Sequence, residues 1–148
     1  MVTHTLSLES TALDQDVLCV TTVLPSYLFI FRLNRLLGLS LARSKEDLKL
    51  ENTADSFAVY EYDCVVMQQS WRVIENHVVS TSPPEQLGMF DRTEQRRLLF
   101  PALSQTDLLI CVNEMTENIT KKIRSISRVI SCTELPKEYN KIKEKLTF

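Results

Sequence analysis

The side chains that could do chemistry are few and widely spaced. The histidines are His4 and His77, and the cysteines are Cys19, Cys64, Cys111 and Cys132. Nucleophilic catalysis needs a thiol or hydroxyl with a base within reach. Cys64, near a predicted hairpin turn, and His77, on the returning strand, form the best pair, but no third group is placed to orient the histidine. We therefore expect no catalytic residues.

Metal and cofactor sites are also not indicated. A structural zinc site needs four Cys or His ligands with short local spacings, whereas these residues are scattered and include no C-x-x-C pair. We interpret the cysteines as buried free thiols. The chain has two glycines, Gly38 and Gly88, and a phosphate-binding loop needs several glycines close together. We expect no metal, no cofactor and no nucleotide loop.

One pair of carboxylates has the spacing of an acid and base pair. Glu61 and Asp63 lie two residues apart in a predicted strand, so both point to the same face. The alternative is that they form the polar, solvated end of a hairpin. We favour this second interpretation because the spacing alone is common on exposed strands.

A basic stripe is the strongest candidate for an interaction site. It comprises Lys121, Lys122, Arg124 and Arg128. Residues 1–91 carry a net charge of −6 and residues 92–148 carry +4, which sum to the −2 of the whole chain. Nucleic-acid binding would also need exposed aromatic side chains or a groove-entering helix, and neither is evident. We predict an acidic protein partner; the alternative is a merely solvated helix face.

Apolar patterns predict the elements that position these groups. Alternating or β-branched runs indicate strands; they cover residues 4–9, 17–23, 56–63, 68–79, 98–103, 107–112 and 128–134. The segments 56–63 and 68–79 read as a hairpin, and the nearly continuous apolar run 107–112 is typical of a central strand. We expect a largely antiparallel sheet of about six strands.

Two main helices and a short C-terminal helix are predicted to pack on this sheet. The first begins at Pro25 and ends before Gly38, and Tyr27, Leu28 and Phe31 widen its apolar arc beyond one stripe. We expect it to be deeply buried; the alternative is a face shared with a partner. The second covers residues 117–127, with Thr116 as its N-cap, and joins two strands that we expect to be parallel.

The segment 81–97 contains two prolines, a glycine and several charges, so we predict an exposed loop. A pocket beneath this loop, lined by Tyr60, Tyr62 and Trp71, is the alternative basis for function. In that case the chain would bind a small molecule or be an enzyme of unrecognised type.

The composition is that of one globular α+β domain over residues 1–148. Apolar residues make up 44% and charged residues 24% of the 148, which are ordinary globular values. Residues 1–10 lack the pattern of a signal peptide, and no apolar run approaches the roughly 18 residues of a membrane span. We expect a cytoplasmic protein without membrane association, and a homodimer is compatible with this sequence.

The segment Phe100-Pro101-Ala102-Leu103-Ser104-Gln105-Thr106-Asp107-Leu108 resembles the motif of the IPExxxVDY family, uncharacterised bacterial proteins named for it. Pro101 and Asp107 match by identity, and Ala102 stands where the family has glutamate. The resemblance covers nearly the whole chain. Residues 33–39 (LNRLLGL) are similar to the family's L-N-K-x-L-G-L, residues 57–62 (FAVYEY) to F-S-x-F-E-Y, and residues 146–148 (LTF) to L-I-F.

This resemblance implies kinship without an activity, because no catalytic residue or cofactor is established for the family. Its members are often encoded beside genes for acyl carrier protein, a ketoacyl synthase, ribonuclease III and pyruvate kinase. Acyl carrier proteins are acidic, so the resemblance implies one as the first partner to test against the basic stripe. The sequence therefore favours a noncatalytic protein-interaction module.

Overall fold

The computed structural model describes residues 15–49, 55–81, 94–113 and 117–146. The strand predicted at residues 4–9 and the cap predicted at Thr116 lie outside these ranges. Within the described residues no helix is both long enough and apolar enough to cross a membrane.

The main sheet has six strands in the order β10-β1-β9-β6-β5-β2, and every neighbouring pair is antiparallel. Its strands are β1 (Asp16–Thr22), β2 (Ala42–Arg43), β5 (Val59–Cys64), β6 (Gln69–Glu75), β9 (Leu108–Val112) and β10 (Val129–Glu134). Two further pairs are β3 (Leu48–Lys49) with β4 (Ser56–Phe57), and β7 (His77–Thr81) with β8 (Glu94–Leu98).

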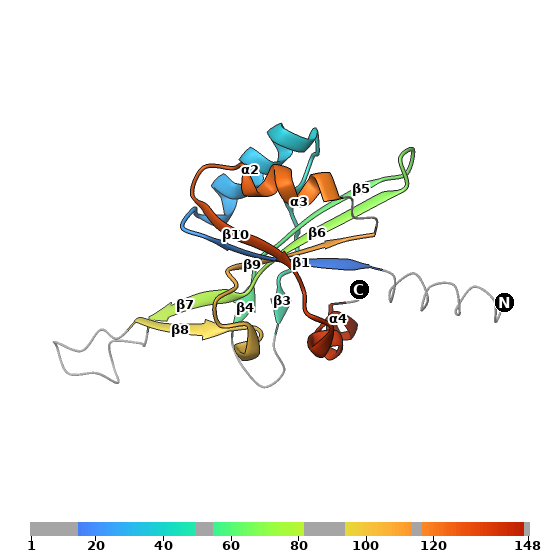
Figure 1. Cartoon of the computed structure of the whole chain (residues 1–148). Coiled ribbons are helices and arrows are strands. Elements are labelled where there is room, and N and C mark those ends of the chain that lie inside the picture. The colour runs from blue at the N-terminus through green and yellow to red at the C-terminus, as the bar shows by residue number, and fades with distance from the viewer. Residues whose placement is uncertain (1–14, 50–54, 82–93, 114–116, 147–148) are drawn as a thin grey trace, which may run out of the picture.

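Helices lie on both sides of this sheet. The α-helices are α2 (Ser26–Leu37), α3 (Glu117–Arg124) and α4 (Asn140–Lys145), and the 3-10 helices are η1 (Pro101–Leu103) and η2 (Lys137–Tyr139). In Figure 1, α2 and α3 lie on one face of the sheet, and α4 lies on the other with β3, β4, β7 and β8. The predicted α+β class, with two main helices and a short C-terminal helix, is confirmed.

The connectivity interleaves two strand-helix-strand units. Because β1 is antiparallel to both β9 and β10, these two strands are parallel to each other with β1 between them. Likewise β1 and β6 are parallel with β9 between them. The predicted pair of parallel strands around α3 is therefore confirmed, and the core has the split β-α-β arrangement of ferredoxin-like domains.

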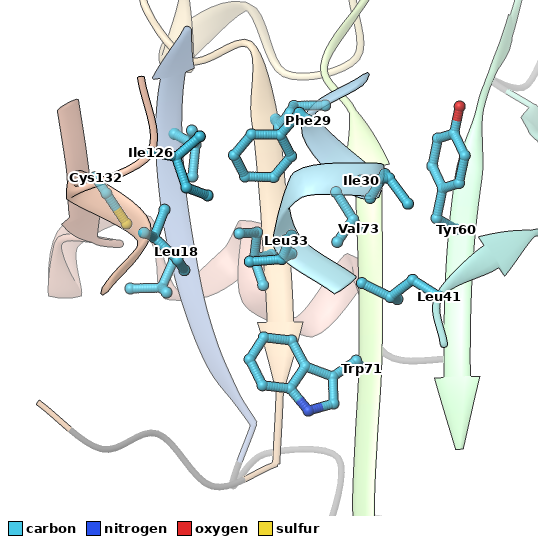
Figure 2. Packing of buried hydrophobic residues seen from close by; sticks show 14 of the residues in the cluster. Leu18, Phe29, Ile30, Leu33, Leu41, Tyr60, Trp71, Val73, Ile126 and Cys132 are labelled. Atoms are coloured by element: carbon cyan, nitrogen blue, oxygen red, sulfur yellow. The ribbon is translucent and has the colours of Figure 1, made fainter. Parts of the chain in front are cut away.

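Both faces of the sheet are packed. On one face, Phe29, Ile30 and Leu33 of α2 lie against Leu18 and Val73 of the strands (Figure 2). The opposite face forms a second cluster; it includes Val17, Cys19, Phe57, Ile74, Leu109 and Leu146. All five residues of β9 are buried, as expected for a central strand with both faces covered.

The ends of α2 match the sequence signals. Pro25 lies at the N-cap, where its missing N–H costs nothing, and Gly38 at the C-cap has φ 67° and ψ 36°. The amide of Gly38 donates to the carbonyl of Asn34, and so does that of Leu39 at 3.0 Å. This left-handed conformation is one that glycine adopts without steric penalty.

We expect Gly38→Ala to lower the free energy of unfolding by about 1 kcal/mol, because an L side chain is strained at this φ. No atom lies within 4 Å of an added Cβ, so the loss is conformational rather than steric. Urea denaturation measures it. Gly38→Asn is the control and should lose less, since asparagine tolerates left-handed backbone; an alanine variant as stable as the wild type would contradict the assignment.

The segment after β8 departs from the prediction. Residues 98–103 were expected to form a strand, but β8 ends at Leu98 and η1 follows at Pro101. The side chain of Asn76 causes this turn: its Nδ2 donates to the carbonyls of Leu103 and Thr106 at 2.9 Å each, and its Oδ1 accepts from the amide of Phe100 at 3.0 Å. Both ends of the predicted 81–97 loop belong to the β7–β8 pair, and residues 82–93 lie outside the described residues.

Candidate functional site

The outer side of α2 exposes two aromatic side chains. Tyr27 is 68% exposed and Phe31 is 60% exposed, whereas Phe29, Ile30 and Leu33 are buried against the sheet. The prediction that the whole wide apolar arc would be buried is therefore wrong. The helix has one side that is buried and another that exposes aromatic rings to water. This arrangement agrees with the alternative interpretation, in which one face of the helix is available to a partner.

The two helices of this layer are also rich in basic residues. We call the outer surface formed by residues 26–37 and 117–128 the helical face. It carries Arg32, Arg35, Lys121, Lys122, Arg124 and Arg128 against the single acidic residue Glu117, a net charge of +5. The remainder of the chain must then carry −7 to give the total of −2. A face of this charge attracts acidic partners and repels basic ones.

The four residues predicted to bind a partner have different environments. Lys121 and Lys122 are exposed on α3. Arg124 reaches back to the sheet, where its Nε donates to the carbonyl of Cys132 at 2.9 Å. Since β10 is the last strand of the sheet, this contact also covers part of an open edge.

Arg128 has a backbone role as well as an exposed side chain. Its φ is 72°, and its carbonyl accepts hydrogen bonds from Thr22 Oγ1 at 2.9 Å and from the Val23 amide at 3.3 Å. Lys121, Lys122 and Arg128 therefore all have exposed side chains, whereas Arg124 is held against the sheet through its Nε.

A shallow hollow of about 340 Å³ lies between the C-terminal half of α2 and the turn that follows α3; we call it the α2 and α3 hollow. Its lining is Arg32, Arg35, Leu36, Ser125, Ile126 and Ser127. Arg32 Nη1 donates to the carbonyl of Ser127 at 3.2 Å, which links α2 to the turn after α3. Leu36 and Ile126 provide apolar contact and the two guanidinium groups provide positive charge, so the hollow suits an apolar side chain close to a carboxylate.

The aromatic residues predicted to line a pocket are part of the packed core instead. Tyr60 is 8% exposed and Trp71 is 2% exposed, and both belong to the cluster beneath α2, with Tyr62 packed against it (Figure 2). Val78 of β7 packs on the opposite face of the sheet. The space that these three side chains would have lined is therefore filled, and it is on the side of the sheet away from β7.

A second hollow, of about 250 Å³, brings together polar side chains that the sequence did not connect. His77 Nδ1 lies 3.6 Å from Asp107 Oδ1, and Ser26 Oγ donates to Glu75 Oε1. Asp107 Oδ2 also accepts from the Thr22 amide at 2.9 Å. These contacts hold the end of β1 and the start of α2. No local motif could have revealed the set, because its members are separated by up to 81 residues of chain.

The segment that resembles the family motif has a structural explanation in the same region. Pro101 begins η1, which Asn76 anchors, and Asp107 binds the end of β1. The two identical residues of the motif therefore occupy a turn and a strand end.

The proposed thiol and imidazole pair is not formed. Cys64 pairs with Gln69 at the β5–β6 turn, whereas His77 follows the opposite end of β6. The intervening strand separates them by roughly 20 Å. All four cysteines are free, and burial raises the pKa of Cys111 to about 12 and that of Cys132 to about 11. Among the described residues no group of His, Cys, Asp or Glu could hold a metal.

Cys64 is the thiol that we expect to react first with iodoacetamide. A hydrogen bond with the Met67 backbone, and a second with Tyr62, lower its pKa from the ordinary 9.0, whereas burial raises the pKa of the other three. Its alkylation rate should therefore rise with pH through a midpoint below 9.0. Peptide mass spectrometry of the labelled protein measures this rate. Rapid labelling of a Cys64→Ser variant would contradict this expectation.

Comparison with protein-family models, with curated proteins and with solved structures found no match to this chain.

Proposed function

We propose that the chain is a noncatalytic interaction module that docks an acidic protein on its helical face. One observation carries the proposal: Tyr27 and Phe31 are exposed on α2, and residues 26–37 and 117–128 of the same helical layer carry a net charge of +5. Exposed aromatics and arginines are the residue types that dominate binding energy at interfaces. Burying two aromatic rings supplies affinity, and the surrounding charges supply orientation and a fast encounter.

The location of the helical face supports this assignment. Side chains pack on both faces of the six-stranded sheet, so the sheet surface itself is occupied. The outer side of the α2 and α3 layer remains as a surface with exposed apolar groups and a net positive charge. We also propose membership of the IPExxxVDY family, and we choose an acyl carrier protein as the first acidic probe.

The proposal is tested by titrating a fluorescently labelled bacterial acyl carrier protein with this chain at low and high salt. We expect saturable binding that weakens as salt increases, because exposed charge pairs are screened. If the double variant Tyr27→Ala with Phe31→Ala binds the probe as tightly as the wild type does, the contact lies elsewhere and the proposed docking site is wrong.

We expect Lys121→Glu with Lys122→Glu to weaken binding of the acidic probe about tenfold, chiefly by slowing association. The matched control makes the same change in charge on the other side of the sheet, with Lys141→Glu and Lys145→Glu in α4. Stopped-flow fluorescence gives both association rates. If the two variants lose the same amount of affinity for the probe, only the total charge matters, and this result would contradict binding at a specific face.

A small-molecule site is the second candidate function. The hollow lined by Ser26, Glu75, His77 and Asp107 favours it, because it places a hydroxyl, an imidazole and two carboxylates around one space. Mass spectrometry of the protein purified under native conditions tests this candidate. A stoichiometric ligand that is lost in His77→Ala would favour it over the interaction module.

A further inference from the structure

The turn between β5 and β6 exposes three consecutive apolar residues. Val65 is 89% exposed, Val66 is 92% exposed and Met67 is 65% exposed. They lie at the end of a long hairpin that projects past the helices (Figure 1). We call residues 65–67 the apolar tip. A projecting group of this kind is typical of an element that inserts into a partner surface.

The apolar tip is held in one shape. The pair Cys64 and Gln69 closes the turn, and the Gln68 amide donates to the Val65 carbonyl at 3.3 Å. Asn113 Nδ2 donates to the Gln68 carbonyl at 2.6 Å, which ties the turn to the end of β9. Because these bonds order the turn before any encounter, docking it costs little conformational entropy.

One of the two strands that lead to the tip, β5, is acidic, whereas β6 places Arg72 opposite Glu61 and leaves Asp63, nearer the tip, opposite Ser70. Glu61 and Asp63 are exposed on β5, and Asp63 Oδ1 accepts from Ser70 Oγ at 2.7 Å. An anionic lipid surface would repel this pair. A receptor with apolar contact and basic side chains would instead attract it, and the α2 and α3 hollow has both properties, with Leu36 and Arg35 in its lining.

We propose that the apolar tip of one molecule docks in the α2 and α3 hollow of a second copy. The inference rests on the proposed function, since it uses the same helical face and names one acidic segment that fits it. The side chains of two valines and a methionine match the apolar part of a hollow of about 340 Å³, and Glu61 and Asp63 then approach its guanidinium groups. The hairpin that carries the tip projects beyond α2 and α3 (Figure 1), and we therefore assign the contact to two copies and not to a single chain.

Such an interface is heterologous, because the two copies use different surfaces. It either closes into a ring or continues as a chain of molecules. It also places self-association in competition with an external acidic partner, so the acidic probe should displace the apolar tip and reduce the mean mass of the assembly.

The test is sedimentation velocity on the pure protein over a range of concentrations, with two variants. The tip variant replaces Val65, Val66 and Met67 with serine, and the face variant carries Arg35→Glu and Leu36→Ser. The wild type should associate as concentration increases, and each variant alone should associate at least about tenfold more weakly. All altered side chains are exposed, so we expect each variant to fold, and circular dichroism tests this.

Mixing the two variants gives the decisive result. The face variant still has an intact tip and the tip variant has an intact hollow, so the mixture should form a one-to-one dimer and nothing larger. A wild type that stays monomeric, a tip variant that associates normally, or a mixture that stays monomeric would each overturn the inference.

The acidic probe separates this inference from the proposed function. The tip variant should bind the labelled acyl carrier protein as well as the wild type does, whereas the face variant should lose that binding. If the wild type does not self-associate, and the face variant but not the tip variant loses binding of the probe, only the self-docking is refuted. If the face variant binds the probe normally, the docking site itself is refuted.

Discussion

Replacing Asn76 with alanine is expected to lower the free energy of unfolding by about 3–5 kcal/mol, the largest loss that we expect from any polar residue described. The side chain is fully buried and makes three hydrogen bonds to the backbone of residues 100–106. Its removal leaves the carbonyl of Thr106 and the amide of Phe100 without this partner, and it removes one of the two hydrogen bonds of the Leu103 carbonyl, which still accepts from the Thr106 amide at 3.0 Å. Each such buried group costs roughly 1–3 kcal/mol, and water entering the space recovers part of it.

Chemical denaturation measures this loss, and two further variants make it specific. Asn76→Asp keeps the shape and the acceptor but cannot donate to the two carbonyls, so it should be at least as destabilising. Asn113→Ala is the matched control, because Asn113 also bonds to two backbone groups but lies partly exposed near the apolar tip; we expect about 1 kcal/mol there. A loss below that value at Asn76 would show that the turn does not depend on it.

Replacing Tyr27 and Phe31 together with alanine is expected to weaken binding of the acidic probe at least about 100-fold, since central aromatic residues each contribute about 2 kcal/mol or more. The unfolding free energy should change by less than about 0.5 kcal/mol, because both rings lie in water in the isolated chain. Fluorescence anisotropy and urea denaturation measure the two quantities.

The control for this pair is a buried aromatic residue of the same helix. Phe29→Ala should cost about 3–5 kcal/mol in stability, because Phe29 is fully buried in the core. Unchanged probe binding in the Tyr27 and Phe31 double variant would contradict the assignment of the face. A large loss of stability in that double variant would show that the two rings are structural.

The elements with strong local signals were predictable. The run of apolar residues in β9, the Pro25 and Gly38 limits of α2 and the β5–β6 hairpin all follow from patterns within a few residues. Their physical causes are local, namely side-chain alternation, a missing amide and a left-handed backbone position.

Other features depend on contacts between distant parts of the chain. Asn76 sits at the end of a strand and gives no sign in the sequence that its partners lie 24 to 30 residues later. Its hydrogen bonds replace the strand predicted at 98–103 with a turn. The pairing of β8 with β7 is likewise a tertiary effect, because the charged segment 94–98 has no strand pattern of its own.

The basic residues of the candidate site could be predicted from the sequence, but the exposure of its aromatic residues could not. Lys121 and Lys122 were identified from their position on an amphipathic helix, and the structure leaves both exposed. Tyr27 and Phe31 were recognised as widening the apolar arc of α2, but periodicity cannot say which side of a nearly all-apolar helix meets the sheet. Tyr60 and Trp71 were assigned to a pocket because aromatic residues suit both pockets and cores.

Site-specific photocrosslinking in native cell extract tests the central claim most directly. The photoreactive residue p-benzoylphenylalanine replaces Phe31 on the helical face or, as the control, Lys141 on α4. We predict that position 31 crosslinks to an acidic protein, that position 141 does not, and that Lys121→Glu with Lys122→Glu abolishes the crosslink. Crosslinks to the same proteins from both positions, or none from position 31, would contradict a docking role for this face.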